Sequence, residues 1–134
     1  MTLEELLATA TSRIRRYTPE EAHAAAQHDA LIVDIRSQDV RERDGAVPGA
    51  LHVPRTVLEW RAASPDWSNP ALHGRRLILV CDHGCSSILA AAALVDLGFD
   101  AGDIVGGFEA WSDAGLETTV PQPVVGLPGT GQPD

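Results

Sequence analysis

The segment "CDHGCSS", Cys81 to Ser87, holds both cysteines of the chain together with a histidine, a glycine and two serines. It follows a short apolar run and precedes an alanine-rich helical pattern. A cysteine between a strand end and a helix N-terminus faces unpaired backbone N–H groups, which stabilise a thiolate. Gly84 would let the chain curl so that its amides point inward, while Ser86 and Ser87 can cap the helix or donate hydrogen bonds. The segment is typical of a loop that stabilises a nucleophilic sulfur and an anion bonded to it.

Other interpretations of the two cysteines stay open at this stage. Cys81 can be a small buried hydrophobic residue, although the polarity of the residues after it favours a loop open to solvent. Cys81, His83 and Cys85 are all zinc ligand types, but they would have to converge from one tight turn, and no second motif supplies a further ligand. We therefore predict no metal and no other cofactor. Cys85 either faces solvent as a variable loop position or resolves an oxidised Cys81 through a reversible disulfide.

Length and charge restrict the class of protein. A chain of 134 residues suits one domain with one hydrophobic core. A formal net charge of -9 argues against a nucleic-acid partner, because phosphate binding needs a basic surface. The first residues lack the pattern of a signal peptide, no apolar run is long enough to span a bilayer, and cysteines this close together cannot form a disulfide framework. We expect a cytoplasmic protein without a nucleic-acid or membrane partner.

The hydrophobic pattern alternates between strands and helices around the cysteine segment. Helical patterns occupy residues 3–14, 18–27, 55–63, 86–97 and 108–115, and strand patterns occupy residues 30–36, 49–54, 75–80 and 103–107. Thr18 and Glu21 have the spacing of a capping box, and Arg13, Arg15 and Arg16 are expected at the end of the first helix. This order predicts a mostly parallel sheet with helices on both faces. Ligands of such sheets bind at the carboxyl ends of the strands, where Cys81 lies.

Three motifs in order resemble the rhodanese-like domain family. The cysteine segment resembles the family's Cys-x-x-Gly-x-x-Ser loop at Cys81, Gly84 and Ser87. An upstream Asp-x-Arg strand and Gly-x-x-Pro-Gly-Ala segment correspond to Asp34, Arg36, Gly45, Pro48, Gly49 and Ala50. The closing Gly-Gly-x-x-x-Trp signature corresponds to Gly106, Gly107 and Trp111. Each motif is weak alone, and the three in order are specific.

The resemblance implies an α/β fold with a central five-stranded parallel sheet. It covers residues 17–118, so with the patterns described above we expect an N-terminal helix at residues 1–16, the rhodanese-like domain at 17–118 and a Pro/Gly-rich, flexible tail at 119–134. It implies a sulfurtransferase in which Cys81 takes a sulfane sulfur from thiosulfate, or from a low-molecular-weight or protein persulfide, and passes it to cyanide, a small thiol or a protein acceptor. The substrate-binding loop would comprise Asp82, His83, Gly84, Cys85, Ser86 and Ser87. Asp34 and Arg36 would support this loop as an ion pair. The alternative is a non-catalytic interaction or regulatory module with the same fold, and the oligomeric state is not predicted.

Two positions depart from the family pattern. Many family loops carry arginine where this chain has Ser86, and the usual histidine of the upstream segment is Ala46. Because serine cannot imitate the planar guanidinium that binds oxyanions, we expect weak use of thiosulfate. The same difference argues against the tyrosine-phosphatase-like branch, whose longer loop ends in arginine. His83 either supplies some positive charge or has no role.

Other positions have expected structural roles. Gly106 and Gly107 should permit a tight strand-to-helix turn, and Trp111 should pack in the core. Trp60 and Trp67 either line the mouth of the pocket or pack on the surface, and we favour the surface. The arginines at 36, 41 and 43 alternate with acidic residues, which predicts a solvated face of mixed charge.

Overall fold

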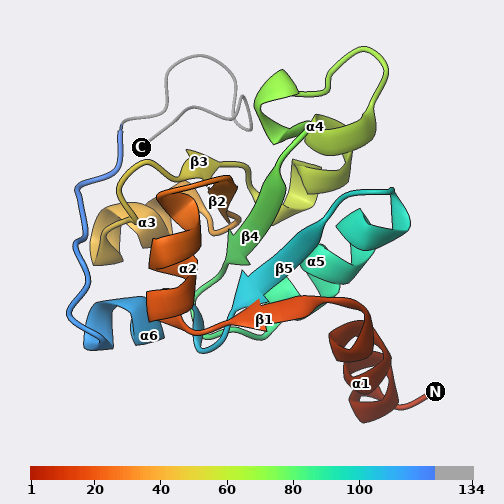
Figure 1. Ribbon diagram of the computed structural model, residues 1–134, viewed down its shortest axis with the longest axis horizontal. Helices are drawn as coiled ribbons and strands as arrows, with labels where there is room; N and C mark the ends of the chain where they lie inside the picture. The colour runs from red at the N-terminus through yellow and green to blue at the C-terminus, as the bar shows by residue number, and fades with distance from the viewer. Residues whose placement is uncertain (123–134) are drawn as a thin grey trace.

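The centre of the computed structural model is a sheet of five parallel strands in the order β1-β5-β4-β2-β3 (Figure 1). The strands are β1 (Arg15–Tyr17), β2 (Ala30–Asp34), β3 (Leu51–His52), β4 (Arg76–Val80) and β5 (Ala101–Ile104). The structure describes residues 1–122. The predicted five-stranded parallel α/β fold is confirmed.

Helices cover both faces of the sheet (Figure 1). They are α1 (Leu3–Arg13), α2 (Pro19–Ala26), α3 (Gln38–Asp44), α4 (Leu58–Ala63), α5 (Ser86–Asp96) and α6 (Gly107–Asp113), with short 3-10 turns at Arg55–Val57 and Pro70–Leu72. Alternate residues of β4 separate the two layers of the core, as the two-residue repeat of a strand requires. Leu77 and Leu79 pack with α4 and α5, whereas Ile78 and Val80 pack with α2 and α6. Among the described helices, none is long and apolar enough to cross a membrane.

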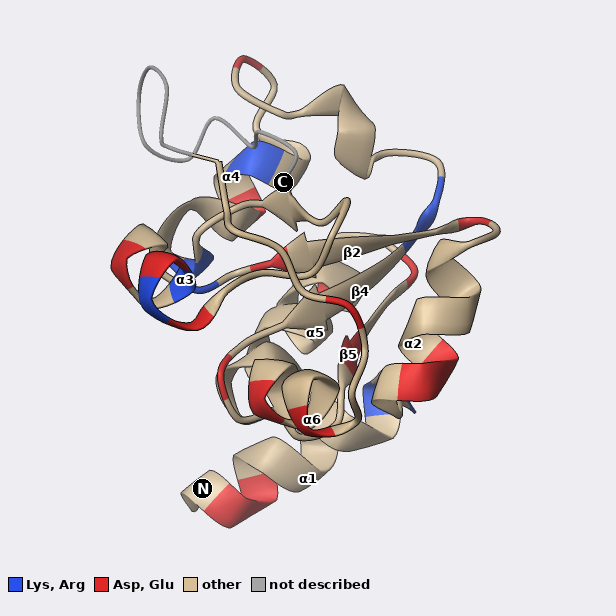
Figure 2. Ribbon diagram, turned by 90° about the vertical axis from the view of Figure 1, so that its left-hand side faces the viewer, with Lys and Arg blue, Asp and Glu red and all other residues tan. Residues whose placement is uncertain are grey.

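Local sequence explains where the first helices begin. The predicted capping box forms, since the Thr18 hydroxyl accepts from the Glu21 amide and the Glu21 carboxylate accepts from the Thr18 amide. α1 starts in the same way at Thr2 and Glu5. Acidic side chains therefore occupy the first turns of α1 and α2, where the helix dipole favours them (Figure 2).

The edge strand β1 was not predicted from the sequence. We expected Arg15 and Arg16 at the end of the first helix, but that helix ends at Arg13 and Ile14 is already extended. Arg15, Arg16 and Tyr17 instead pair with β5. Three residues are too few to show a strand period, and their strand conformation follows from the hydrogen bonds that they make with β5.

The chain near the C-terminus returns to the start of the upstream glycine segment. Ala46 and Thr119 exchange two backbone hydrogen bonds of 2.8 Å each in an antiparallel bridge. Most of the segment predicted to be a Pro/Gly-rich tail, residues 123–134, lies outside the described residues.

Candidate active site

Cys81 directly follows β4 at the carboxyl edge of the sheet, and the residues after it turn into α5. It is only 5% exposed, more buried than expected from the polar sequence around it. Cys81 nevertheless lines a cavity of about 260 Å³, whose other walls are Ile35, Arg36, Asp82, His83, Cys85 and Ser86. The residue is therefore part of the core and also faces a cavity formed mostly by its own loop.

The sulfur of Cys81 contacts groups that stabilise a negative charge. The backbone N–H of Gly84 donates to Sγ at 3.1 Å, and the thiol donates to Oγ of Ser87 at 3.2 Å. Burial raises the pKa of this thiol, but hydrogen bonds from the side chain and backbone of Ser87, the side chain of Ser86 and the backbone of Gly84 outweigh it and lower the pKa below its usual value. This environment favours a reactive thiolate.

The curled loop requires glycine because backbone segments approach closely. Gly84 has a φ of +82°, and a Cβ there would lie 2.6 Å from the backbone nitrogen of Gly106. Gly107 has a φ of +63°, and a Cβ there would lie 2.5 Å from the carbonyl oxygen of Cys81. That carbonyl accepts a hydrogen bond of 2.7 Å from the amide of Phe108. The predicted tight turn at Gly106 and Gly107 is confirmed, and it lies directly against the cysteine loop.

A buried polar group under the loop was missed by the sequence analysis. The Ser87 hydroxyl donates to Oδ2 of Asp103 at 2.7 Å, and both residues are fully buried. Arg16 donates to both oxygens of Asp103, at 2.9 Å and 3.0 Å, and to the carbonyl of Gly84 at 3.0 Å. Neither Ser86 nor Ser87 caps α5, contrary to one expectation. A charged residue within the apolar pattern at 101–105 was the available signal.

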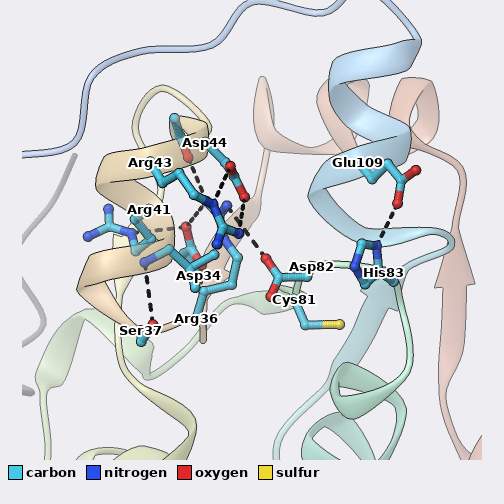
Figure 3. A network of polar contacts seen from close by, with 12 residues as sticks. Asp34, Arg36, Ser37, Arg41, Arg43, Asp44, Cys81, Asp82, His83 and Glu109 are labelled. Carbon is cyan, nitrogen blue, oxygen red and sulfur yellow. Dashed lines mark hydrogen bonds and ion pairs between the residues drawn. The ribbon is translucent and has the colours of Figure 1, made fainter.

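A second buried ion-pair group lies on the other side of the loop (Figure 3). The predicted pair forms: Arg36 donates to Asp34 from Nε at 3.0 Å and from Nη2 at 2.7 Å. Arg41 also donates to Asp34, at 3.0 Å. The prediction of a solvated mixed-charge face is wrong for Arg36 and Arg41, which are buried because they share this carboxylate. It holds for Arg43, which is exposed and paired with Asp44.

Nη1 of Arg36 has no hydrogen-bond partner among the described residues. Its Nη2 also donates to the carbonyl of Gly45 at 2.8 Å, and its guanidinium lies over the ring of Phe108 at 4.2 Å. The nearest carboxylate on the Nη1 side is that of Asp82, 4.0 Å away. This distance is too long for a hydrogen bond.

The remaining loop side chains point in different directions. His83 is exposed and its Nδ1 lies 2.5 Å from the Glu109 carboxylate (Figure 3). Cys85 is exposed, and both it and the buried Cys81 are free thiols. Within residues 1–122, no three His, Cys, Asp or Glu side chains form a group that could hold a metal ion. The zinc interpretation therefore has no geometric support in the described loop.

The predicted aromatic positions separate into core and surface. Trp111 is buried as expected and donates from Nε1 to the carbonyl of Glu117 at 2.9 Å. Trp60 is exposed beside Leu97, away from the cysteine cavity. The Trp67 ring instead stacks on the guanidinium of Arg61 at 4.6 Å. Both Trp60 and Trp67 therefore pack on the surface, the alternative that we favoured, and neither lines the cavity at Cys81.

The sequence model of the family described as the rhodanese-like domain matches residues 18–114 of this chain. This chain belongs to the rhodanese-like domain family. The match contains the loop of Cys81, the ion pair of Asp34 and Arg36, and the turn of Gly106 and Gly107.

Named relatives match most of the chain. A thiosulfate sulfurtransferase GlpE of Pseudomonas syringae pv. syringae (strain B728a) is 35% identical over 115 residues, which cover 85% of this chain and 97% of the relative. Another GlpE, of Stutzerimonas stutzeri (strain A1501), is 39% identical over 98 residues, or 72% of this chain and 84% of the relative. The solved structure of a protein of unknown function from Rhodopseudomonas palustris CGA009, described as a possible tyrosine phosphatase, has a TM-score of 0.81 and 33% identity, covering 88% of this chain and 94% of that one.

Proposed function

We propose that this protein is a rhodanese-type sulfurtransferase in which Cys81 carries the transferred sulfur as a persulfide. The observation that carries the proposal is the environment of the sulfur, which accepts the Gly84 amide at 3.1 Å and lines a cavity. The GlpE relatives, matched over most of their length, carry the name thiosulfate sulfurtransferase and support the same activity. The reaction needs a reduced thiol, which fits the predicted cytoplasmic location.

The reaction has two displacement steps on sulfur. The Cys81 thiolate attacks the outer sulfur of thiosulfate, a new S–S bond forms, and the bond within thiosulfate breaks as sulfite leaves with the electron pair. Cyanide then attacks the outer sulfur of the persulfide, which gives thiocyanate and restores the thiolate. A thiol acceptor would instead take the sulfur as its own persulfide. In both cases the amide of Gly84 is placed to stabilise the anion on the loop.

Two other functions deserve a direct test. Tyrosine phosphatase activity, suggested for the neighbour from R. palustris, needs strong oxyanion binding, but the loop of this chain has no arginine between Cys81 and Ser87. A docking module would use the same fold with an inactive cysteine. We favour sulfur transfer because a lowered thiol pKa and an inward-facing amide have no function in a docking module.

The experiment is a turnover assay with matched substrates. Thiocyanate formation from thiosulfate and cyanide, sulfur transfer from glutathione persulfide to dithiothreitol, and hydrolysis of p-nitrophenyl phosphate are measured for wild type and for Cys81→Ser. We expect sulfur transfer by wild type alone and no phosphatase activity in either. Phosphatase turnover that depends on Cys81, or no turnover of any substrate by folded wild type, would overturn the proposal. Thermal unfolding of the variant checks that it folds.

A further inference from the structure

One donor of the buried Arg36 guanidinium is unpaired in the part of the chain that the structure describes. The Arg36 side chain is only 1% exposed, and its Nη1 has no hydrogen-bond partner among the residues described. Leaving a buried N–H group without an acceptor costs free energy, and such groups in native proteins call for an explanation. A ligand that supplies the missing acceptor is a direct explanation, because Arg36 and Cys81 line the same cavity.

Asp82 is the acidic side chain next to this nitrogen. Its Oδ1 lies 4.0 Å from Nη1, and the Asp82 side chain is 41% exposed. Figure 3 shows the Asp82 carboxylate directed toward Arg36 from the start of the cysteine loop. The Asp82 backbone is held independently, since its carbonyl accepts the Glu109 amide at 3.1 Å. The carboxylate can therefore rotate into solvent by its own side-chain torsions while the loop stays in place.

The charges around Arg36 favour an anion at this position. Asp34 accepts hydrogen bonds from both Arg36 and Arg41, so its negative charge is shared between two guanidinium groups. A guanidinium edge binds an oxyanion through directed N–H donors, which a serine hydroxyl cannot match. Ser86 replaces the arginine of many family loops, so Arg36 offers a guanidinium that the loop itself lacks.

We infer that Nη1 of Arg36 binds the oxyanion group of the sulfur donor, a sulfonate or a carboxylate, and that Asp82 competes with the donor for this position. The inference rests on the proposed sulfur transfer. Donor binding displaces the Asp82 side chain toward solvent and places the oxyanion beside the loop of Cys81. Asp82 is thereby a residue that determines donor specificity, since its negative charge disfavours doubly charged donors such as thiosulfate.

The test compares two alkylating reagents that differ in charge, and it needs no sulfur transfer. Iodoacetate carries a carboxylate and iodoacetamide is its neutral analogue, so the ratio of their rates at Cys81 measures how well the site accepts an oxyanion. All proteins carry Cys85→Ser so that only Cys81 reacts. We expect Asp82→Ala to raise the iodoacetate-to-iodoacetamide ratio about tenfold, because it removes the competing carboxylate and uncovers a guanidinium donor.

Glu109→Ala is the matched control, because Glu109 is another exposed carboxylate beside the loop but pairs with His83 instead of Arg36. We expect it to change the ratio less than about twofold, as for a screened surface charge. In an Arg36→Lys background, the effect of Asp82→Ala should shrink to that of the control. Equal effects of Asp82→Ala and Glu109→Ala, or an Asp82→Ala effect that persists in folded Arg36→Lys protein, would overturn the inference. If Arg36→Lys does not fold, the comparison of Asp82→Ala with Glu109→Ala decides whether the inference holds.

The steady-state KM for thiosulfate separates this inference from the proposed function. If both hold, Asp82→Ala lowers this KM by a factor similar to the change in the alkylation ratio. A changed ratio without any thiosulfate turnover would support the oxyanion position and refute sulfur transfer from thiosulfate. Turnover with an unchanged ratio and an unchanged KM would refute the oxyanion position alone.

Discussion

Two ion-pair groups, each built on a buried carboxylate, lie on opposite sides of the Cys81 loop, and they differ in whether their buried donors are all paired. On the β5 side, Asp103 accepts from Arg16 at both oxygens and from Ser87. On the β2 side, Asp34 binds Arg36 and Arg41, yet one nitrogen of Arg36 lacks a hydrogen-bond partner within residues 1–122. Both carboxylates are fully buried, but of the two groups only the second has a buried donor without a hydrogen-bond partner among the described residues.

The difference indicates that the two ion-pair groups have different roles at the Cys81 sulfur. The β5-side group connects to the loop at Ser87 and at the Gly84 carbonyl, so it fixes the backbone and hydroxyl that contact Sγ. The β2-side group does not contact the sulfur but shares the cavity with it through Arg36. We infer that the first group positions the nucleophile and the second recognises what the nucleophile attacks.

The largest effect is expected where the loop backbone itself is forced to move. Gly84→Ala places a Cβ against the backbone of Gly106, at a φ of +82°, so the Gly84 amide cannot remain on the sulfur. We expect sulfur transfer to fall by about a hundredfold or more, as for a misplaced catalytic group. Gly98→Ala is the control, since Gly98 also has a positive φ but nothing lies within 4 Å of its Cβ position.

In Gly98→Ala we expect a loss of about 1–2 kcal/mol in the free energy of unfolding, from backbone strain alone. The folded fraction should turn over like wild type. Thermal unfolding and thiocyanate formation measure the two effects. A folded Gly84→Ala protein with wild-type turnover would show that sulfur transfer does not need the Gly84 amide.

The next prediction concerns the ion pair between Arg16 of the edge strand β1 and the buried Asp103. Arg16→Met leaves the fully buried Asp103 without its guanidinium partner, which should lower the free energy of unfolding by about 3 kcal/mol. Arg13→Met removes a surface pair with Asp96 and should cost less than about 1 kcal/mol. Urea unfolding monitored by tryptophan fluorescence measures both. Similar losses in the two variants would mean that Asp103 does not depend on Arg16.

The third prediction concerns the protonation of Cys81. In the thiol state the single Ser87 hydrogen is donated to Asp103; in the thiolate state it can turn to the sulfur, because Arg16 still satisfies Asp103. Ser87→Ala therefore raises the pKa of Cys81. Alkylation by iodoacetamide should then slow at acidic and neutral pH and recover at alkaline pH, with the midpoint shifted upward by about one pH unit.

Ser86→Ala is the comparison for this shift. The Ser86 side chain also lowers the pKa of Cys81, but the residue is exposed, so water can replace its hydroxyl. Its pH profile should move less than that of Ser87→Ala. A profile that moves downward in Ser87→Ala would show that the hydroxyl stabilises the thiol, because Asp103 keeps its hydrogen.

The sequence predicted the parts of this site that are formed by residues close together in the chain. Cys81 was placed because an apolar strand pattern ends just before it, and Gly106 and Gly107 because a strand-to-helix turn needs positive φ angles. The pairing of Arg36 with Asp34 is also local, two residues apart. These features follow from short-range chemistry, so one chain was enough to find them.

The parts that were missed depend on strand order. Arg16 and Asp103 are 87 positions apart and meet because β1 pairs with β5, which no periodicity in three residues reveals. Arg41 looked like a surface residue within an alternating charge pattern, and it is buried because its guanidinium pairs with Asp34 at the end of β2. Long-range pairing of charges therefore needed the structure.

The smallest predicted effect concerns how the site binds thiosulfate. Ser86→Arg restores a guanidinium at the position where many family loops have one, and Ser86 lines the cavity of Cys81. We expect the KM for thiosulfate to fall by about threefold to tenfold, because the new guanidinium can bind the oxyanion of thiosulfate together with Arg36. Ser86→Gln, similar in reach but uncharged, should leave the KM near that of wild type. An unchanged KM in folded Ser86→Arg would show that the cavity already has enough positive charge for thiosulfate.

Whether Cys81 carries the sulfur is read from the mass of the protein after exposure to a sulfur donor. Wild type is incubated with thiosulfate or glutathione persulfide, freed of the donor and analysed by intact-mass spectrometry and peptide mapping. We predict the added mass of one sulfur atom on Cys81, removed by cyanide, also present in Cys85→Ser and absent from folded Cys81→Ser. Added sulfur on Cys85 alone, or none on folded wild type with either donor, would contradict the assignment of Cys81 as the residue that carries the sulfur.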